Sequence, residues 1–118
     1  MSSSANLLIE TPWNIDPVQA QILLQHTPGQ VSVIDVREPW EWEIVALPGA
    51  RLWPLGTLLQ TPQEILEEIQ IPVLTLCHHG VRSLKAAQWL RSRGILAQSI
   101  HGGIDAWARL VDTSLPVY

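Results

Sequence analysis

A single cysteine stands between a short apolar run and a segment with helical periodicity. The run Val73–Leu76 ends directly before Cys77, and the helical segment opens six residues later at Ser83. In a loop between a strand and a helix N-terminus, backbone N–H groups and the helix dipole can stabilise a negative charge on sulfur. Because the thiolate is the nucleophilic form of cysteine, this spacing predicts a reactive nucleophile at Cys77.

Two histidines follow the cysteine directly. Adjacent histidines with one cysteine have no recognised metal-ligand spacing, so we expect no metal site here. We interpret His78 either as a residue that contacts the substrate or as an exposed loop residue. His79 is interpreted as structural or solvent-facing.

The composition excludes several classes of protein. The chain has 118 residues and a net charge of −4, which predicts no basic patch and no nucleic-acid partner. Its longest uncharged run, residues 17–34, contains four glutamines and two prolines, so we expect no membrane span. The first residues lack the basic and apolar regions of a signal peptide, so we expect none. One cysteine cannot form an internal disulfide, which is consistent with a reducing cytoplasm.

Proline and glycine residues mark the ends of the helices that we expect. The N-cap residue Asp16 before Pro17 predicts a helix that ends at Pro28, and Pro39 begins a short helix through about Val45. A third helix follows Thr61-Pro62 and ends before Pro72, with Ile65, Leu66 and Ile69 inward. A fourth covers Ser83–Arg93, with Lys85, Gln88, Arg91 and Ser92 outward and Gly94 as its C-terminal cap. Gly102-Gly103 opens a final helix around Trp107.

Short β-branched and apolar runs alternate with these helices. We expect strands at the ranges Val31–Val36, Arg51–Trp53, Val73–Leu76 and Ile95–Ile100. The alternation predicts an α/β fold with a central, mostly parallel sheet of about five strands and helices on both faces. Ligands of such sheets bind beyond the carboxyl ends of the strands, where Cys77 falls. We interpret residues 1–6 as a flexible tail and residues 7–118 as a single domain.

Charged residues cluster after the first long strand. Asp35 and Arg37 stand at its end and are interpreted as structural support rather than as an acid and a base. The acidic residues Glu38, Glu41 and Glu43 are interpreted as a solvated helix face.

Four stretches together resemble one known family. The loop Cys77–Ser83 resembles the active-site loop of the rhodanese family of sulfurtransferases. Residues 35–39, residues 47–50, and Gly102-Gly103 with Trp107 four positions further on resemble other family signatures, in the expected order. The chain is therefore similar to a single-domain, rhodanese-like sulfurtransferase, and the resemblance implies that fold.

The resemblance also implies a mechanism. The Cys77 thiolate would attack the outer sulfur of a donor such as thiosulfate and release sulfite, which leaves a persulfide on Cys77. Cyanide, or a cellular thiol on a small molecule or a protein, would then take the sulfur. No cofactor is implied beyond this covalent intermediate.

The loop residues acquire roles from the same resemblance. Backbone amides of the loop would stabilise the persulfide, and Gly80 would supply the backbone freedom that the curl requires. Arg82 either pairs with an anionic donor or braces the loop against a carboxylate. The predicted binding loop comprises His78, His79, Gly80, Val81, Arg82 and Ser83.

Three other interpretations remain open. A lone cysteine at a strand end can be a small core residue. The chain can be a non-catalytic rhodanese-like binding module, or one in which Cys77 senses redox state. It can also be a small cysteine phosphatase or an arsenate-handling enzyme. In such phosphatases five residues separate the cysteine from an arginine that binds phosphate, whereas four residues separate Cys77 from Arg82. The shorter loop favours an anion smaller than phosphate.

Overall fold

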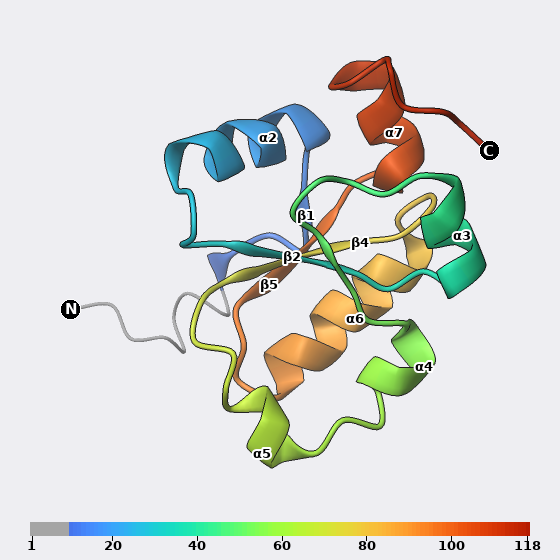
Figure 1. Cartoon of the computed structure of the whole chain (residues 1–118). Helices are drawn as coiled ribbons and strands as arrows, with labels where there is room; N and C mark the ends of the chain where they lie inside the picture. The colour runs from blue at the N-terminus through green and yellow to red at the C-terminus, as the bar shows by residue number, and fades with distance from the viewer. Residues whose placement is uncertain (1–9) are drawn as a thin grey trace.

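Five parallel strands form the centre of the fold (Figure 1). The computed structural model describes residues 10–118, so the expected tail at residues 1–6 lies outside the described residues. Neighbouring strands in the sheet follow the order β1-β5-β4-β2-β3, and all four pairs are parallel. The prediction of a parallel α/β sheet is confirmed. The strands are β1 Asn14–Ile15, β2 Ser32–Asp35, β3 Arg51–Leu52, β4 Val73–Leu76 and β5 Ala97–Ile100.

Helices cover both faces of this sheet, as the alternating sequence pattern predicts (Figure 1). On one face lie α2 (Pro17–His26) and α7 (Gly103–Leu110). On the other face lie α4 (Leu55–Leu58), α5 (Gln63–Leu66) and α6 (Val81–Ser92). The short helix α3 (Pro39–Ile44) follows β2 and lies near the loop after β4.

The central strand β4 is buried on both faces, which explains its unbroken apolar character. Leu74 and Leu76 pack into the cluster beneath α2 and α7, whereas Val73 belongs to the cluster beneath α6. Cys77, at the end of the same strand, lies on the α6 side. The strand therefore delivers the cysteine to the edge of the sheet next to the N-terminus of α6.

Several boundaries differ from those expected. Helix α6 begins at Val81, two residues before the predicted start. The helix after Pro62 is only one turn long, and Ile65, expected inward, is 47% exposed, because a single turn buries only Leu66. Strand β1 and helix α4 were not predicted, since elements of two and four residues carry too little periodicity.

Arg91 is also placed differently from the prediction. It was expected on the solvent face of its helix, but only 8% of it is exposed. Its guanidinium donates to the backbone carbonyls of Ala97 and Pro12 at 2.7 and 2.6 Å and lies over the Trp13 ring. Periodicity failed here because a long side chain can bury its stem and still reach carbonyl oxygens at the edge of the sheet.

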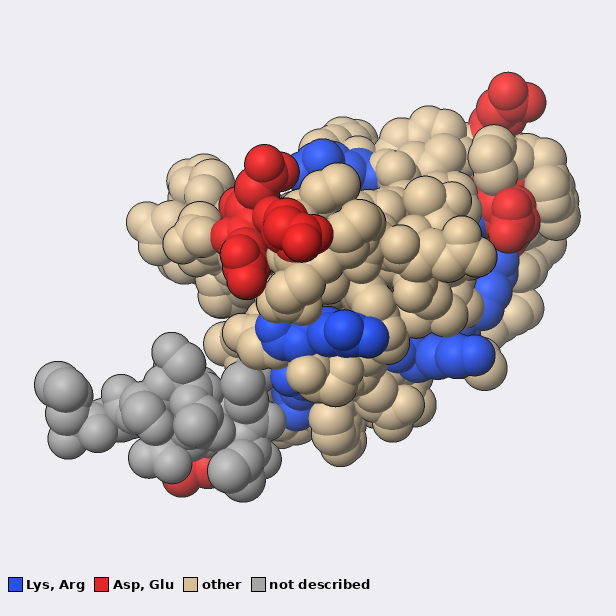
Figure 2. All heavy atoms as spheres, turned by 90° about the horizontal axis from the view of Figure 1, so that it is seen from below, with Lys and Arg blue, Asp and Glu red and all other residues tan. Residues whose placement is uncertain are grey.

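The surface carries separate acidic and basic groups on its underside (Figure 2). Glu64, Glu67 and Glu68, around α5, are all exposed. Among residues 10–118, no helix combines the length and the hydropathy required to span a bilayer.

Candidate active site around Cys77

The Cys77 sulfur is buried but has polar partners. Only 1% of the residue is exposed, and it borders the apolar cluster beneath α6. Yet the Gly80 backbone N–H donates to Sγ at 3.0 Å, and Ser83 Oγ lies 3.2 Å from Sγ. A purely structural core cysteine needs neither contact, so the surroundings suit a sulfur that carries negative charge.

The turn that aims the Gly80 amide at the sulfur depends on glycine. Gly80 is the N-cap residue of α6 and has a φ of 101°, a region that other residues rarely adopt. The first N–H groups of a helix have no acceptor within the helix, and the helix dipole adds partial positive charge at this end. The sulfur therefore lies where the backbone itself favours an anion.

A second glycine allows α7 to pack against the same loop. The Ile104 N–H donates to the Cys77 carbonyl at 2.8 Å, and the Asp105 N–H donates to the His78 carbonyl at 3.1 Å. A side chain at Gly103 would overlap both carbonyl groups. The Gly102-Gly103 pair is thus required for the close approach that fixes the backbone of Cys77 and His78.

Hydroxyl groups lie behind the sulfur. Ser83 Oγ lies 2.7 Å from Ser99 Oγ, and both serines are fully buried. Thr75 Oγ1 donates to the Ser83 carbonyl at 2.7 Å, which fixes the first turn of α6 against β4. Sequence reasoning found Ser83 but missed Thr75 and Ser99. The only available signal was a small polar residue within each predicted buried strand.

Arg82 braces the loop against a carboxylate, which is one of its two predicted roles. Its guanidinium forms two hydrogen bonds with Glu41, of 2.6 and 2.9 Å. These bonds lower the pKa of Glu41 to about 2, although burial opposes the shift, and they also raise the pKa of Arg82. The prediction that Glu41 is solvated is therefore wrong, because only 3% of it is exposed, whereas Glu38 and Glu43 are exposed as expected.

Asp35 and Arg37 form a second, fully buried ion pair. Arg37 donates to both carboxylate oxygens of Asp35, to the Val45 carbonyl at 2.6 Å and to the Glu41 carbonyl at 3.2 Å. Burial opposes its charge, but the hydrogen bonds to Asp35 and Tyr118 raise the pKa of Arg37 overall. The pair ties β2 to α3, which accords with a structural role.

Tyr118 joins the two ion pairs. Its hydroxyl donates to Glu41 Oε2 at 2.6 Å and accepts from Arg37 at 2.9 Å. Burial raises the pKa of Tyr118 to about 12, so the hydroxyl keeps its proton near neutral pH. We call Asp35, Arg37, Glu41, Arg82 and Tyr118 the charged network.

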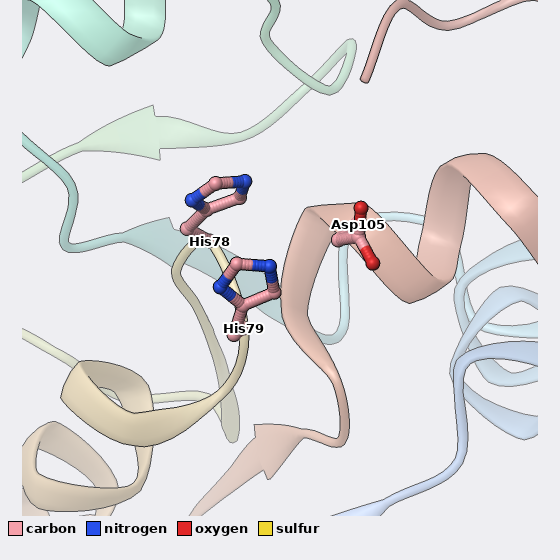
Figure 3. Close-up of side chains that lie close together, drawn as sticks. All are labelled: His78, His79 and Asp105. Atoms are coloured by element: carbon pink, nitrogen blue, oxygen red, sulfur yellow. The ribbon is translucent and has the colours of Figure 1, made fainter. Parts of the chain in front are cut away.

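The two loop histidines and Asp105 lie close together (Figure 3). The His78 ring stacks on Tyr118 at 3.8 Å and on His79 at 3.9 Å, and its Nε2 lies 2.7 Å from the backbone oxygen of Tyr118. Asp105 pairs with Arg109, which lowers the pKa of that carboxyl.

This arrangement fits a metal ion poorly. The potential ligand atoms of His78, His79 and Asp105 lie within 4.8 Å of one another. Stacked imidazole rings, however, direct their in-plane lone pairs side by side rather than toward one point, and His78 and Asp105 already have protein partners. The expectation of no metal site at this loop stays a prediction.

The structure thus divides the predicted loop residues into three groups. Gly80 and Ser83 contact the sulfur, and Arg82 is held by Glu41. His78 is half-buried in the ring stack, His79 is exposed at its end, and Val81 is 78% exposed.

Sequence comparison gives a consistent result. The profile of the Rhodanese-like domain matches residues 19–110. The adenylyltransferase and sulfurtransferase MOCS3 of Drosophila ananassae is 39% identical over 93 residues, which cover 73% of this chain and 21% of that protein. The chain spans less than a third of the length of the curated relatives that it matches.

Two solved structures match this chain over almost their whole length. A rhodanese-like domain protein from Staphylococcus aureus has a TM-score of 0.72 at 27% identity, covering 91% of this chain and 99% of that chain. The human single-domain sulfurtransferase TSTD1 has a TM-score of 0.68 at 25% identity, covering 84% and 97%.

Proposed function

The chain belongs to the rhodanese-like domain family, and on this basis we propose that it is a sulfurtransferase that carries a sulfane sulfur on Cys77. The observation that supports this most strongly is the pair of polar contacts at Sγ, from the Gly80 N–H and from Ser83 Oγ. They belong to the one cysteine of the chain, at the sheet edge where ligands of parallel sheets bind.

The first half-reaction transfers sulfur to the protein. The Cys77 thiolate attacks the outer sulfur of thiosulfate, a new S–S bond forms, and the S–S bond of thiosulfate breaks with its electron pair leaving on sulfite. Total charge is conserved, since thiolate and thiosulfate become persulfide anion and sulfite. Sulfite is a stable anion, so this step needs no strong general acid.

The second half-reaction restores the thiolate. Cyanide, or a thiolate on a small molecule or a protein, attacks the outer sulfur of the Cys77 persulfide. The persulfide S–S bond breaks with its electrons returning to Sγ, and thiocyanate or a new persulfide leaves. Neither half-reaction requires a metal or an organic cofactor, because the sulfur is carried covalently on Cys77.

The main contribution of the protein is that its backbone N–H groups stabilise the negative charge on sulfur. The Gly80 amide and the first turn of α6 favour the anionic sulfur in both half-reactions, and Ser83 adds a hydroxyl. Gly103 and α7 hold the loop in this curl through the Cys77 and His78 carbonyls. Preorganised donors of this kind need not reorient as negative charge moves between sulfur atoms.

The position of Arg82 makes phosphatase chemistry the weaker interpretation. An arginine that clamps phosphate must offer its N–H groups to the ligand. Two N–H groups of Arg82 are bound to Glu41 instead, and the loop is one residue shorter than in the phosphatases that resemble it. A smaller, singly charged terminal sulfur suits this loop better.

More than one sulfur donor should be tested, because the positive charge available to bind thiosulfate is limited. An imidazole such as that of His78 gives less positive charge than a guanidinium would for a dianion such as thiosulfate. The activity test therefore measures thiocyanate formation from cyanide with either thiosulfate or an organic persulfide as donor, and thiol persulfidation in place of cyanide.

Wild-type protein is expected to turn over at least one donor, and Cys77→Ser is expected to be inactive, because its hydroxyl cannot hold sulfane sulfur. His26→Ala, on the exposed end of α2, is the matched control and should remain active. Equal activity of wild type and Cys77→Ser, including no activity in both, would favour the non-catalytic module.

A further inference from the structure

Two buried hydroxyl groups stand in series behind the Cys77 sulfur. Sγ lies 3.2 Å from Ser83 Oγ, which lies 2.7 Å from Ser99 Oγ. Both serines have no exposed surface. Sulfur and the two hydroxyls therefore form a short chain of hydrogen bonds within the protein interior.

The protons of this chain can be counted. Each hydroxyl donates one hydrogen bond and can accept others. Within residues 10–118, the side chain of Ser99 has one hydrogen-bond partner, Ser83 Oγ, and Ser83 Oγ has two, Ser99 and Cys77. The direction of one hydrogen bond in this series therefore fixes the direction of the other.

One of the two directions leaves a buried donor unpaired. If a Cys77 thiol donated to Ser83, then Ser83 would donate to Ser99, and the Ser99 proton would have no acceptor among these atoms. In the other direction, Ser99 donates to Ser83 and Ser83 donates to Sγ, so both hydroxyl protons have an acceptor, and no donor is left unpaired once the sulfur is ionised. An unpaired buried hydroxyl is more unfavourable than an unpaired thiol, because S–H is the weaker donor, so the second direction prevails.

In that second direction the sulfur accepts two hydrogen bonds. One comes from the Ser83 hydroxyl, across the same 3.2 Å contact in which a thiol would be the donor, and the other comes from the Gly80 N–H at 3.0 Å. A thiolate accepts hydrogen bonds better than a thiol does, because the charged partner strengthens each bond. The order of the two hydroxyls thus favours ionised sulfur.

We propose that Ser99 is a positioning residue, which directs the Ser83 hydroxyl toward Cys77 and so favours the thiolate over the thiol. Ser99 acts only through Ser83, since its own hydroxyl bonds to Ser83 and not to the sulfur. The inference deepens the proposed function, because the thiolate is the form that would accept sulfur from a donor.

The sheet holds the chain of hydroxyls in place. Ser99 on β5 pairs in parallel register with Thr75 on β4, so their side chains share one face of the sheet. Thr75 Oγ1 donates to the Ser83 carbonyl at 2.7 Å, which fixes the residue whose hydroxyl faces Cys77. The geometry is therefore set by backbone pairing and not by flexible side chains.

Charged groups around the loop are the same in every variant proposed below. Arg82 interacts electrostatically with Cys77 and is bound to Glu41 of α3. His78 follows Cys77 in the chain, and the Asp35–Arg37 pair lies at the end of β2. Asp105 lies on α7, which donates to the Cys77 carbonyl through Ile104. Serine substitutions leave all of these charges in place.

The test is an ultraviolet titration of the thiolate in the purified protein. The chain has one cysteine and one tyrosine, and burial raises the pKa of Tyr118 to about 12, so the two signals separate. Wild type is compared with Ser83→Ala, Ser99→Ala and the double variant. Ser92→Ala, on the exposed end of α6, is the matched control.

Ser83→Ala is expected to move the midpoint of the thiolate signal upward by about one pH unit, and Ser99→Ala by about half a unit. The double variant should match Ser83→Ala alone, because Ser99 then has nothing to direct. Ser92→Ala should match wild type. Ser99→Thr keeps the hydroxyl on a side chain suited to a strand and should keep the wild-type midpoint.

The proposal is overturned if Ser99→Ala titrates like wild type, or if it adds the same upward shift in the Ser83→Ala background. A Ser99→Thr midpoint that moves as far as that of Ser99→Ala would also contradict it. The titration uses no sulfur donor, so it can fail while wild type still takes up sulfur, and it can succeed in a protein that does not.

Discussion

Two different kinds of support hold the Cys77 loop. Toward α3 lies the charged network, in which Arg37 and Arg82 are paired with Asp35 and Glu41. Toward β4 and β5 lie the uncharged hydroxyls of residues 75, 83 and 99. Both supports are largely buried, but only the hydroxyl side provides an atom that contacts the sulfur, through Ser83.

The two supports have different roles: one sets the position of the loop, and the other affects the reactivity of the sulfur. In the charged network the carboxylates and guanidinium groups bind one another. Their opposite charges therefore largely cancel, which leaves little net electrostatic effect on the sulfur. The hydroxyls carry no net charge but can reorient a proton toward sulfur. We infer that the network fixes where the loop lies, and that the hydroxyls influence which form of sulfur is present.

The largest expected effect comes from the centre of the charged network. Arg37→Met leaves the Asp35 carboxylate buried without its cation and removes donors from the Val45 and Glu41 carbonyls. Breaking a buried pair in this way should lower the free energy of unfolding by about 3–5 kcal/mol, measured by urea denaturation.

The matched control is Arg109→Met, which breaks the exposed pair with Asp105 and should leave the free energy of unfolding unchanged. Equal stability of the Arg37→Met protein and wild type would show that the network does not support the fold.

A smaller effect is expected at the link between the network and the loop. Glu41→Gln removes the charge that holds Arg82 and should lower the free energy of unfolding by about 1–2 kcal/mol, after allowance for solvent screening of the half-exposed arginine. Glu43→Gln, on the exposed side of the same helix, is the control and should behave as wild type.

The Glu41 effect should depend on pH in a defined direction. Its pKa falls from the ordinary 4.5 to about 2 in the folded protein, chiefly through hydrogen bonds from Arg82. The stabilisation is therefore fully present above pH 4.5 and is lost as the pH falls toward 2. Urea denaturation across this range should show the gap between wild type and Glu41→Gln closing at low pH, and a constant gap would contradict the assignment.

The smallest effect on stability is expected on the hydroxyl side. Ser99→Ala removes one hydrogen bond between neutral groups and should change the free energy of unfolding by about 1 kcal/mol or less. Thermal unfolding measures this. A loss as large as that of Arg37→Met would mean that Ser99 is chiefly structural, and the contrast between the two supports would fail.

Much of the fold follows from local signals. Pro17 and Pro39 begin helices as predicted, because proline fits the first helical turn. The apolar run before Cys77 forms the central strand, and Gly102-Gly103 forms the turn into α7. These residues act through backbone geometry, which depends mainly on the chain immediately around them.

Partners that are distant in sequence could not be found in this way. Glu41 has the spacing of an exposed helix residue, and its burial follows from Arg82, which lies 41 positions later. Ser99 resembles any small residue of a strand until β4 and β5 are placed in register. Asp105 joins the loop histidines only because α7 packs against the loop.

The most direct test of the central claim is the intact mass of the protein before and after exposure to a sulfur donor. If Cys77 is held as a reactive anion by its loop, wild type should gain the mass of one sulfur atom, lose it again on treatment with cyanide or a thiol, and Cys77→Ser should gain nothing. A wild-type mass that stays unchanged after both thiosulfate and an organic persulfide would contradict the account.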